Sequence, residues 1–263
     1  MTRLALALLF ICGARPAGAL LPSWDAQVSA IVDKKFSIPE PGFRSFPAGP
    51  VFHQGPADVP AVAITFDDGP GASTPGVLEV LARHGVKATF FVVGREVERR
   101  PALAARIVQE GHEIANHTYS HANFCSRALR GPGRRDMLKE DIKEGAQAIL
   151  SATGVKTRLL RMPYGCNRRW IDDLADRLGY TLVLWSVDCR DWSRPGAAEL
   201  ATRALENARA GSVILLHDGG GDRTQTVAAL DLILYGLEAK GLRAVPAGEL
   251  LKPHPKGARP AAR

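Results

Sequence analysis

The sequence predicts a parallel α/β domain, built either as a barrel or as a doubly wound sheet. Short β-rich runs alternate with longer amphipathic segments, which gives six or seven strand-helix units. Several of the short runs are apolar on both faces, as parallel strands buried on two sides are. The composition agrees, because a chain of 263 residues that is 46% hydrophobic and 23% charged can bury one large core.

Residues 1–19 are predicted to be a signal peptide. Arg3 supplies a positive charge, residues 4–12 form an unbroken apolar run, and Ala17 to Ala19 offer the small residues of a cleavage site. An apolar run of about ten residues is too short to span a bilayer, which needs roughly 20, and no later segment reaches that length. We therefore expect an exported protein, periplasmic or secreted, without a stable membrane span.

The remaining chain divides into an arm, a domain and a tail. Six prolines between positions 39 and 60 interrupt any regular element, so residues 20–60 are predicted to be a Pro/Gly-rich arm that lies on the domain. Residues 61–251 form the predicted domain. Residues 252–263 lack apolar periodicity and are expected to be a basic disordered tail.

The elements of the domain follow in order from the pattern. The strand candidates are residues 61–66, 88–94, 112–115, 159–162, 180–187, 212–216 and 242–245. Helical patterns cover residues 75–84, 96–110, 136–152, 170–178, 197–209 and 224–240. Glycines stand where a helix end requires a left-handed residue, at Gly85, Gly111, Gly154, Gly179, Gly211 and Gly241.

Two carboxylates stand side by side where the first strand of the domain ends. The strand leads directly into Asp67, Asp68, Gly69 and Pro70. An ordinary Asp-Gly-Pro turn explains one aspartate but not two, because adjacent carboxylates repel unless a cation or a proton lies between them. In parallel α/β folds functional groups collect at this end of the strands, so we expect chemistry here.

A pair of histidines follows the third strand. His117 and His121 are four residues apart, which would place both imidazoles on one face of a single helical turn, close enough to bind one metal ion. Two histidines with one carboxylate and an open water position form a common catalytic arrangement for zinc and related ions. Either Asp67 or Asp68 can supply the carboxylate.

Three other enzyme classes do not fit. His112 and His117 are five apart, whereas the His-Glu-x-x-His motif of zinc proteases requires four. The surroundings of Ser73 lack the Gly-x-Ser-x-Gly pattern of serine hydrolases. The three glycines 219–221 lack the lysine of a phosphate-binding loop, and we interpret them as a flexible strand-to-helix connection.

The later strands also end in polar or aromatic residues. The fourth ends in Arg-Met-Pro-Tyr at 161–164, the fifth in Asp-Cys-Arg-Asp-Trp at 188–192, and the sixth in Leu-Leu-His at 215–217. Each motif alone is compatible with a salt bridge or a core residue. Together they place an arginine, an aspartate, a tryptophan and a histidine at the same end of the domain as the predicted metal site.

With these motifs in this order, the sequence resembles the NodB-homology polysaccharide deacetylases, carbohydrate esterase family four, over about residues 60–250. The five matching motifs are Thr-Phe-Asp-Asp-Gly-Pro at 65–70, His-Thr-Tyr-Ser-His at 117–121, and the three at 161–164, 188–192 and 215–217. The resemblance implies a single-domain, distorted (β/α) barrel of about seven parallel strands that holds one divalent cation. Zinc is expected, with cobalt or manganese as alternatives.

The resemblance also implies roles for individual residues. It implies that Asp68, His117 and His121 are the metal ligands and that Asp67 is the general base, which takes a proton from water whose pKa the metal has lowered. His217 would be the general acid, with Asp191 as the partner that holds its charge.

Four further residues complete the implied site. Arg161 would keep Asp67 ionised and oriented, and the backbone N–H of Tyr164 would stabilise the oxyanion together with the metal. Trp192 and Leu215 would form apolar walls around the sugar and the acetyl methyl group, although a plain core role for Leu215 stays open.

The predicted reaction is removal of N-acetyl groups from a polysaccharide that contains N-acetylglucosamine, either chitin-like or peptidoglycan. Removal of O-acetyl groups from a xylan-type polysaccharide by the same residues is one alternative. A catalytically silent carbohydrate-binding module is another, and the intact set of Asp67, Asp68, His117, His121 and His217 disfavours it. The oligomeric state stays open.

Cleavage of the signal peptide would leave Cys125, Cys166 and Cys189. Export permits disulfides, and at most one internal pair can form. Cys166 and Cys189 follow two strands that we expect to be neighbours, which would bring their Cα atoms within disulfide reach. Cys125 is an alternative partner for either, and buried free thiols are a further alternative.

The formal charge of +7 suggests an anionic partner, but the positions of the basic residues weaken that interpretation. The signal peptide and the tail contain six basic residues and no acid, so residues 20–251 are almost neutral and nucleic-acid binding loses its support. One cluster remains within the domain, at Arg127, Arg130, Arg134 and Arg135. It is either a solvated basic loop or a surface that holds an anionic polymer.

Overall fold

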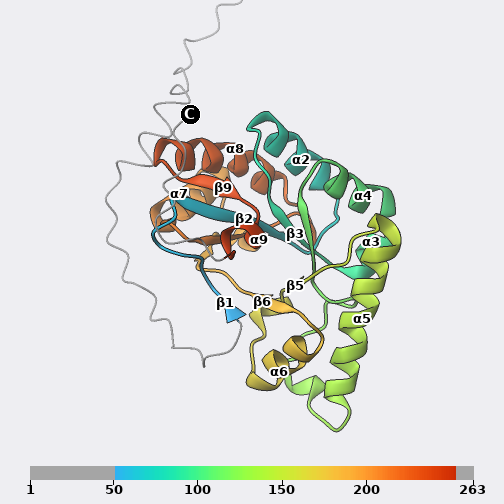
Figure 1. Ribbon diagram of the computed structural model, residues 1–263. Helices are drawn as coiled ribbons and strands as arrows, with labels where there is room; N and C mark the ends of the chain where they lie inside the picture. The colour runs from blue at the N-terminus through green and yellow to red at the C-terminus, as the bar shows by residue number, and fades with distance from the viewer. Residues whose placement is uncertain (1–50, 253–263) are drawn as a thin grey trace, which may run out of the picture.

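Parallel strands form one curled sheet in the computed structural model, which describes residues 51–252 (Figure 1). In chain order the strands are β1 (Val51–Phe52), β2 (Ala61–Asp67), β3 (Thr89–Val92), β4 (Glu113–Asn116), β5 (Leu159–Leu160), β6 (Thr181–Val183), β7 (Val187–Asp188), β8 (Val213–His217) and β9 (Arg243–Val245). Their order across the sheet is β1-β6-β5-β4-β3-β2-β8-β7, and β9 pairs with the first half of β2. This is the expected distorted barrel, left open between its two edges.

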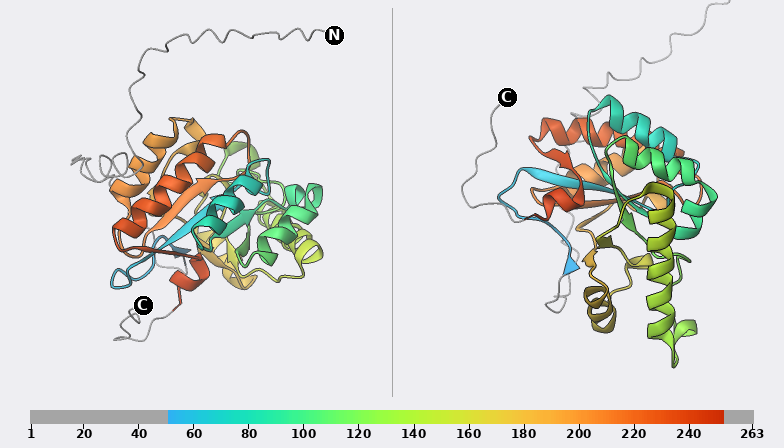
Figure 2. Two further views of the ribbon diagram at one scale, coloured as in Figure 1. Left: turned by 90° about the horizontal axis from the view of Figure 1, so that it is seen from above. Right: turned by 45° about the vertical axis from the view of Figure 1, so that its right-hand side comes forward.

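Helices connect the strands, and most of them cover the outer face of the sheet (Figures 1 and 2). They are α2 (Thr74–Arg83), α3 (Gly94–Arg99), α4 (Pro101–Gln109), α5 (Arg134–Thr153), α6 (Arg169–Arg177), α7 (Ala197–Asn207), α8 (Thr224–Ala239) and α9 (Ala247–Leu250). The short 3-10 turns η1 (Arg127–Leu129), η2 (Pro163–Gly165) and η3 (Asp191–Ser193) lie in strand-to-helix loops. All six glycines predicted to close helices have positive φ, which confirms them as left-handed positions.

The central strand β2 is buried on both faces, as its continuous apolar run predicts. Val62, Ile64 and Phe66 belong to the outer core, which also contains residues of α2 and α8. Ala61 and Ala63 face the inside of the curl, where α9 adds Ala247 and Leu250 to the same cluster. At this end of β2 the inner face therefore carries small side chains, whereas the outer face carries large ones.

The segment predicted as one strand, residues 180–187, is two strands at opposite ends of the sheet. β6 pairs with β1 and β5, whereas β7 pairs only with β8. Residues 184–186 carry the chain across the opening. The backbone N–H of Leu184 donates to the carbonyl oxygen of Phe52 in the edge strand β1, and that of Ser186 donates to the carbonyl oxygen of Val213 in β8, beside the other edge strand. A continuous apolar run hides such a crossing, because both halves are buried.

The helix predicted over residues 96–110 is divided at Pro101. Proline has no N–H to donate and disfavours a helical conformation at the residue before it. Arg100 accordingly has φ −138° and ψ 55°, and α3 ends there while α4 begins at Pro101. The short helix α9 was not predicted, because four residues are too few to show periodicity.

Some predicted segments lie outside the described residues: the signal peptide, residues 20–50 of the arm and residues 253–263 of the tail. The described end of the arm is not wholly irregular, because Val51–Phe52 pair in parallel with β6. No helix between residues 51 and 252 is long and apolar enough to cross a membrane.

The disulfide joins Cys125 to Cys166, whose Cα atoms are 5.5 Å apart. The predicted neighbourhood of Cys166 and Cys189 is wrong, because β5 lies between β4 and β6 while β7 lies beyond β8. Cys189 is a buried free thiol, and burial raises its pKa well above the ordinary value. The pair that forms ties the loop after β4 to the loop after β5.

Candidate active site

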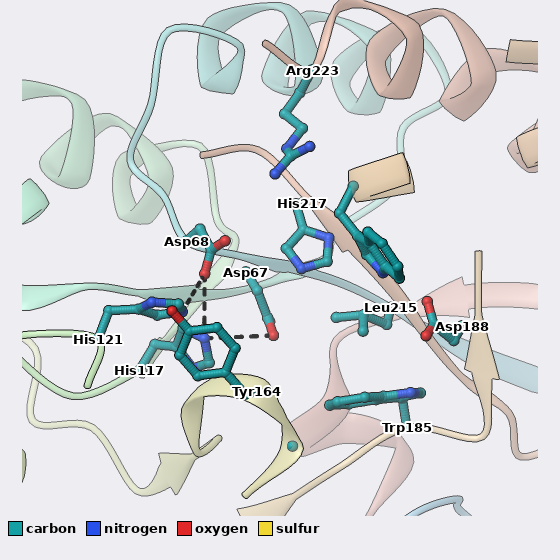
Figure 3. Close-up of a pocket in the computed structure, with 12 residues that line it drawn as sticks. Asp67, Asp68, His117, His121, Tyr164, Trp185, Asp188, Leu215, His217 and Arg223 are labelled. Atoms are coloured by element: carbon teal, nitrogen blue, oxygen red, sulfur yellow. Dashed lines mark ion pairs between the residues drawn. The ribbon is translucent and has the colours of Figure 1, made fainter. Parts of the chain in front are cut away.

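The two adjacent aspartates point into one cavity because the chain changes direction between them (Figure 3). Asp67 is the last residue of β2 and is almost completely buried. Asp68 has a left-handed backbone with φ 71°, which breaks the strand's alternation. Both carboxylates therefore face the mouth of the sheet, as predicted from their place at the strand end.

The two histidines follow β4, but not on a helical turn as predicted. Thr118 and His121 have positive φ, and residues 117–121 form a bent loop. The loop is held by hydrogen bonds from the backbone N–H of Ser120 to Asp141 Oδ1 and from that of His121 to Thr118 Oγ1. The imidazole centroids of His117 and His121 are 5.1 Å apart, so the loop achieves the proximity that the spacing suggested.

The hydrogen bond of His117 fixes which of its nitrogens carries the proton. Its Nδ1 lies 2.7 Å from the carbonyl oxygen of Arg161, and because a carbonyl can only accept, Nδ1 donates. In the neutral ring Nε2 then has a free lone pair, directed at Asp68. A backbone partner on one ring nitrogen is a common way to orient a metal-binding histidine.

Asp68, His117 and His121 form a cluster that could hold a metal ion. One ligand atom from each residue lies within 4.8 Å of the others. Asp68 Oδ1 is 2.9 Å from His121 Nε2 and 3.4 Å from His117 Nε2. Burial opposes ionisation of Asp68, but the two imidazoles outweigh it and lower its pKa below the ordinary value.

The donor chemistry of this cluster fits a divalent cation. Asp68 Oδ1 is buried and accepts no hydrogen bond of adequate geometry, so a polar oxygen is left unsatisfied. Two imidazole nitrogens and one carboxylate oxygen are the donors of many catalytic zinc sites. A cation among them would satisfy Asp68 and use the lone pair of His117 Nε2.

Asp67 is held by a fully buried arginine. Arg161 Nη1 donates to Asp67 Oδ1 at 2.7 Å and to Thr65 Oγ1 at 2.9 Å. Its Nε and Nη2 donate to the carbonyl oxygens of Val183 and Leu184, on the chain that crosses the opening of the sheet. Burial lowers the pKa of the guanidinium, and Asp67 partly offsets this. Asp67 therefore keeps one oxygen fixed and presents Oδ2 to the cavity.

A second pair lies across the cavity, between His217 at the end of β8 and Asp191 in η3. His217 Nδ1 is 2.6 Å from Asp191 Oδ1, and the other carboxylate oxygen accepts from His217 N and Thr226 Oγ1. Burial lowers the pKa of His217, but Asp191, with smaller contributions from Asp67 and Asp68, outweighs it and raises the pKa to about 9. The same pairing lowers the pKa of Asp191. His217 therefore keeps its proton and directs Nε2 away from Asp191.

One cavity of about 480 Å³ is lined by Asp67, Asp68, His117, His121 and His217 (Figure 3), together with Tyr164, Leu215 and Trp192. Tyr164 and Trp192 are largely exposed, with 66% and 52% of their surface accessible, whereas Leu215 is buried. Tyr164 has φ 60°, and its backbone N–H has no acceptor among residues 51–252. Every site residue predicted from the sequence thus lies in the cavity or in direct contact with one that does.

Comparisons with known proteins point to one family. Residues 54–183 match the family model described as polysaccharide deacetylase. A peptidoglycan-N-acetylglucosamine deacetylase of Bacillus cereus is 41% identical over 210 residues, 78% of this chain and 95% of that protein. The chain belongs to the NodB-homology polysaccharide deacetylases. A chitooligosaccharide deacetylase of Sinorhizobium fredii is also 41% identical, over 71% of this chain and 91% of that protein.

Solved structures of family-four carbohydrate esterases share the fold of this deacetylase. A peptidoglycan N-acetylglucosamine deacetylase crystallised with a naphthyl N-hydroxybenzamide has a TM-score of 0.72 and 35% identity, and the match covers 77% of this chain and 93% of that chain. A pseudoenzyme of the family from Bacillus anthracis has a TM-score of 0.70 and 30% identity over 77% of this chain and 69% of that one. Activity therefore depends on the side chains of the cavity, and not on the fold alone.

Besides Gly165, three residues that line the cavity of this deacetylase were not predicted: Trp185, Asp188 and Arg223. Trp185 lies on the segment that crosses the opening of the sheet, which the sequence pattern hid within a strand. Asp188 belongs to the motif at 188–192, where only Asp191 and Trp192 were assigned roles. Arg223 lies shortly after the three glycines, at the start of α8. Because this loop follows a strand end, its position in the sequence could have identified Arg223 as a cavity residue.

The glycines 219–221 are more than a flexible connection. A Cβ at Gly219 would overlap the carbonyl group of Asp68, so only glycine allows this approach. Arg223 is buried, and its Nε and Nη2 donate to the carbonyl oxygens of Gly219 and Gly220. Asp218 N also donates to Asp67 O. The loop after β8 thus packs against the turn that presents the two aspartates.

Proposed function

We propose that this deacetylase removes N-acetyl groups from a polysaccharide that contains N-acetylglucosamine, either peptidoglycan or a chitin-like glycan. One observation carries the proposal: three donors that could hold a metal share a cavity with an arginine-held carboxylate and a protonated histidine. The activities named for two relatives at 41% identity support the same class of substrate.

Asp68, His117 and His121 would hold one divalent cation, for which we propose zinc, with cobalt and manganese as alternatives. When bound, such a cation polarises a carbonyl group and lowers the pKa of water from about 15.7 toward roughly 7. Three protein donors leave room for water and substrate, which is the arrangement of catalytic zinc sites.

Asp67 is proposed as the general base. Arg161 occupies its Oδ1 through an ion pair and fixes the carboxylate, so Oδ2 is available to accept a proton from water. As the water oxygen forms a bond to the acetyl carbon, charge develops on the acetyl oxygen. The unpaired backbone N–H of Tyr164 is proposed as the fixed donor for that oxygen.

His217 is proposed as the general acid. Its Nε2–H would donate a proton to the amide nitrogen as the carbon-nitrogen bond breaks, which releases acetate and leaves a free amine on the sugar. Asp191 holds the imidazolium charge before this transfer and fixes the ring through Nδ1. Trp192 and Leu215 are proposed as walls around the sugar and the acetyl methyl group.

We also propose that the chain is exported, to the periplasm or to the medium. The basic residue, apolar run and small residues within positions 1–19 support a signal peptide. The disulfide between Cys125 and Cys166 supports an oxidising compartment, because such bonds are rare in the cytosol.

Acetate release tests the proposed reaction. The zinc-loaded enzyme is incubated with chitin oligomers, peptidoglycan and acetylated xylan, and acetate is measured over time. We expect release from the N-acetylated glycans at a rate well above that from xylan.

Release from xylan alone would replace the proposal by an O-acetyl esterase. No release from any of the three with zinc, cobalt or manganese would identify a silent binding module.

A further inference from the structure

A second cavity lies beside the catalytic one, in the region where the sequence shows its arginine cluster. It has a volume of about 440 Å³ and is lined by Arg130, Arg134, Arg168 and Trp170, together with Cys125. We refer to the first four residues as the basic pocket. None of them belongs to the site described above.

The arginines of the basic pocket have no carboxylate partner among residues 51–252. Arg168 donates only to the carbonyl oxygen of Asn167, and Arg130 and Arg134 form no ion pair. Elsewhere on the surface, arginines such as Arg106 and Arg203 pair with a glutamate one helical turn away. Three cations that surround one hollow repel each other, so a bound anion would relieve that repulsion.

Helix α5 adds to the positive potential of the pocket. The helix has 20 residues and begins at Arg134, so its first turn already carries the partial positive charge of the helix N-terminus. A cation there is unfavourable for the helix, whereas an anion is favourable. Figure 1 shows this end of α5 beside α6, the helix that begins next to Arg168.

Trp170 holds one of the arginines in place. The Arg134 guanidinium carbon is 4.4 Å from the centroid of the indole ring, and that of Arg135 is 5.8 Å away. Stacking fixes the plane of the Arg134 guanidinium, so less rotational freedom is lost when it binds an anion. The sequence suggested Arg135 as well, but Arg135 does not line the cavity.

The loops after β4 and β5 contribute residues to both the basic pocket and the catalytic cavity. His121 lines the catalytic cavity and Cys125 lines the basic pocket, and the four residue steps from one Cα atom to the other span at most about 14 Å. Across the disulfide, Cys166 follows Tyr164 by two residues. A glycan that reaches beyond the sugar being deacetylated can therefore contact both.

We propose that the basic pocket binds a carboxylate group of the polysaccharide substrate, so that the enzyme prefers an acidic glycan such as peptidoglycan over neutral chitin. The inference rests on the proposed function, since it assigns the substrate class of the same reaction. Arginine suits this task because its planar fork of N–H donors matches a carboxylate.

The test uses one pair of substrates and one pair of variants. Peptidoglycan fragments are compared with the same fragments whose carboxyl groups have been amidated. Arg168→Glu reverses a charge in the basic pocket, and Arg169→Glu makes the same change at the adjacent exposed residue, which does not line it. Metal content and melting temperature establish that both variants fold.

For Arg168→Glu we expect KM on the acidic fragments to rise roughly five- to tenfold with kcat nearly unchanged. KM on the amidated fragments should stay as in the wild type, and Arg169→Glu should change neither. Added salt should raise the wild-type KM on acidic fragments only. An equal rise on both substrates, or with both variants, would overturn the proposal.

Direct binding separates this inference from the proposed reaction. The affinity of the wild type and of Arg168→Glu for the acidic fragments is measured by calorimetry, which does not require turnover. Weaker binding of Arg168→Glu supports the basic pocket even if no acetate is released. Equal affinity of the two proteins contradicts it, whatever the activity.

Discussion

The catalytic cavity and the basic pocket are neighbours, but they differ in whether their charged side chains have partners of opposite charge. At the catalytic cavity, two ion pairs fix the groups proposed to transfer protons: Arg161 pairs with Asp67, and Asp191 pairs with His217. In the basic pocket, the guanidinium groups of Arg130, Arg134 and Arg168 have no carboxylate partner in the described chain. Paired charges fix groups for a reaction, whereas unpaired charges retain affinity for an incoming anion.

Burial explains why the two arrangements are both stable. Arg161 is fully buried, so its charge must be compensated within the protein, and loss of one partner of such a pair costs about 3–5 kcal/mol. Arg168 is exposed to water, which solvates its charge without a partner. Substitutions in the cavity should therefore have large effects, and substitutions in the basic pocket small and substrate-dependent ones.

Among substitutions of residues that support the catalytic groups, the largest effect is expected for Asp191→Asn. Without the carboxylate, burial still lowers the pKa of His217 while the main contribution that raises it is lost, so the pKa falls from about 9 and less of the general acid is protonated at neutral pH. We expect kcat to fall roughly 10²- to 10⁴-fold and the alkaline limb of the pH–rate profile to move to lower pH. A pH series of acetate release measures both.

Stability should change with pH in the same sense. Because the folded-state pKa of His217 is raised, the pair stabilises the wild type fully below pH 6.5 and loses this contribution as pH rises through about 9. The variant should lack that dependence. Asp188→Asn is the matched control, since Asp188 lines the same cavity without bonding to His217. Similar losses in both variants would mean that general negative charge, and not the pairing, matters.

A smaller effect is expected for Gly219→Ala. The added Cβ overlaps the carbonyl group of Asp68 and must displace the turn that presents this carboxylate. Disturbing the support of a metal ligand typically weakens metal binding by about 10- to 100-fold. Titration with zinc measures the affinity.

Gly131→Ala provides the control for this substitution, because nothing lies within 4 Å of its added Cβ and its φ is not in the left-handed region. Unchanged zinc affinity in Gly219→Ala would contradict a supporting role for the loop after β8.

The smallest effect is the one expected for Arg168→Glu, in which only the KM on acidic glycans should change.

Local patterns in the sequence predict much of this fold. The apolar run before Asp67 and the six helix-closing glycines depend on neighbouring residues only, and both agree with the structure. The strand ends also predict which residues meet in the cavity, because parallel strands share one carboxyl edge. That rule brings Asp67, His117 and His217 together although they are far apart in the chain.

What the sequence did not predict depends on long-range contacts. The crossing at residues 184–186 and the hydrogen bonds from Arg161 to Val183 and Leu184 require knowledge of where the sheet opens. The Cys125–Cys166 bond depends on the order of the strands in the sheet, and the spacing of the cysteines in the sequence does not indicate that order. In the loop from His117 to His121, two residues with left-handed backbone bring the imidazole rings as close together as one helical turn would. Neither residue is a glycine, so nothing in the sequence indicates this backbone conformation.

The central claim is that two adjacent carboxylates have separate tasks: Asp68 holds the metal and Asp67 accepts the proton. The direct test measures metal content and acetate release together in Asp67→Asn and Asp68→Asn. The claim predicts that Asp67→Asn keeps one equivalent of metal while acetate release falls roughly 10²- to 10⁴-fold, and that Asp68→Asn loses both. Unchanged acetate release from Asp67→Asn, or an active wild type that carries no metal, would contradict it.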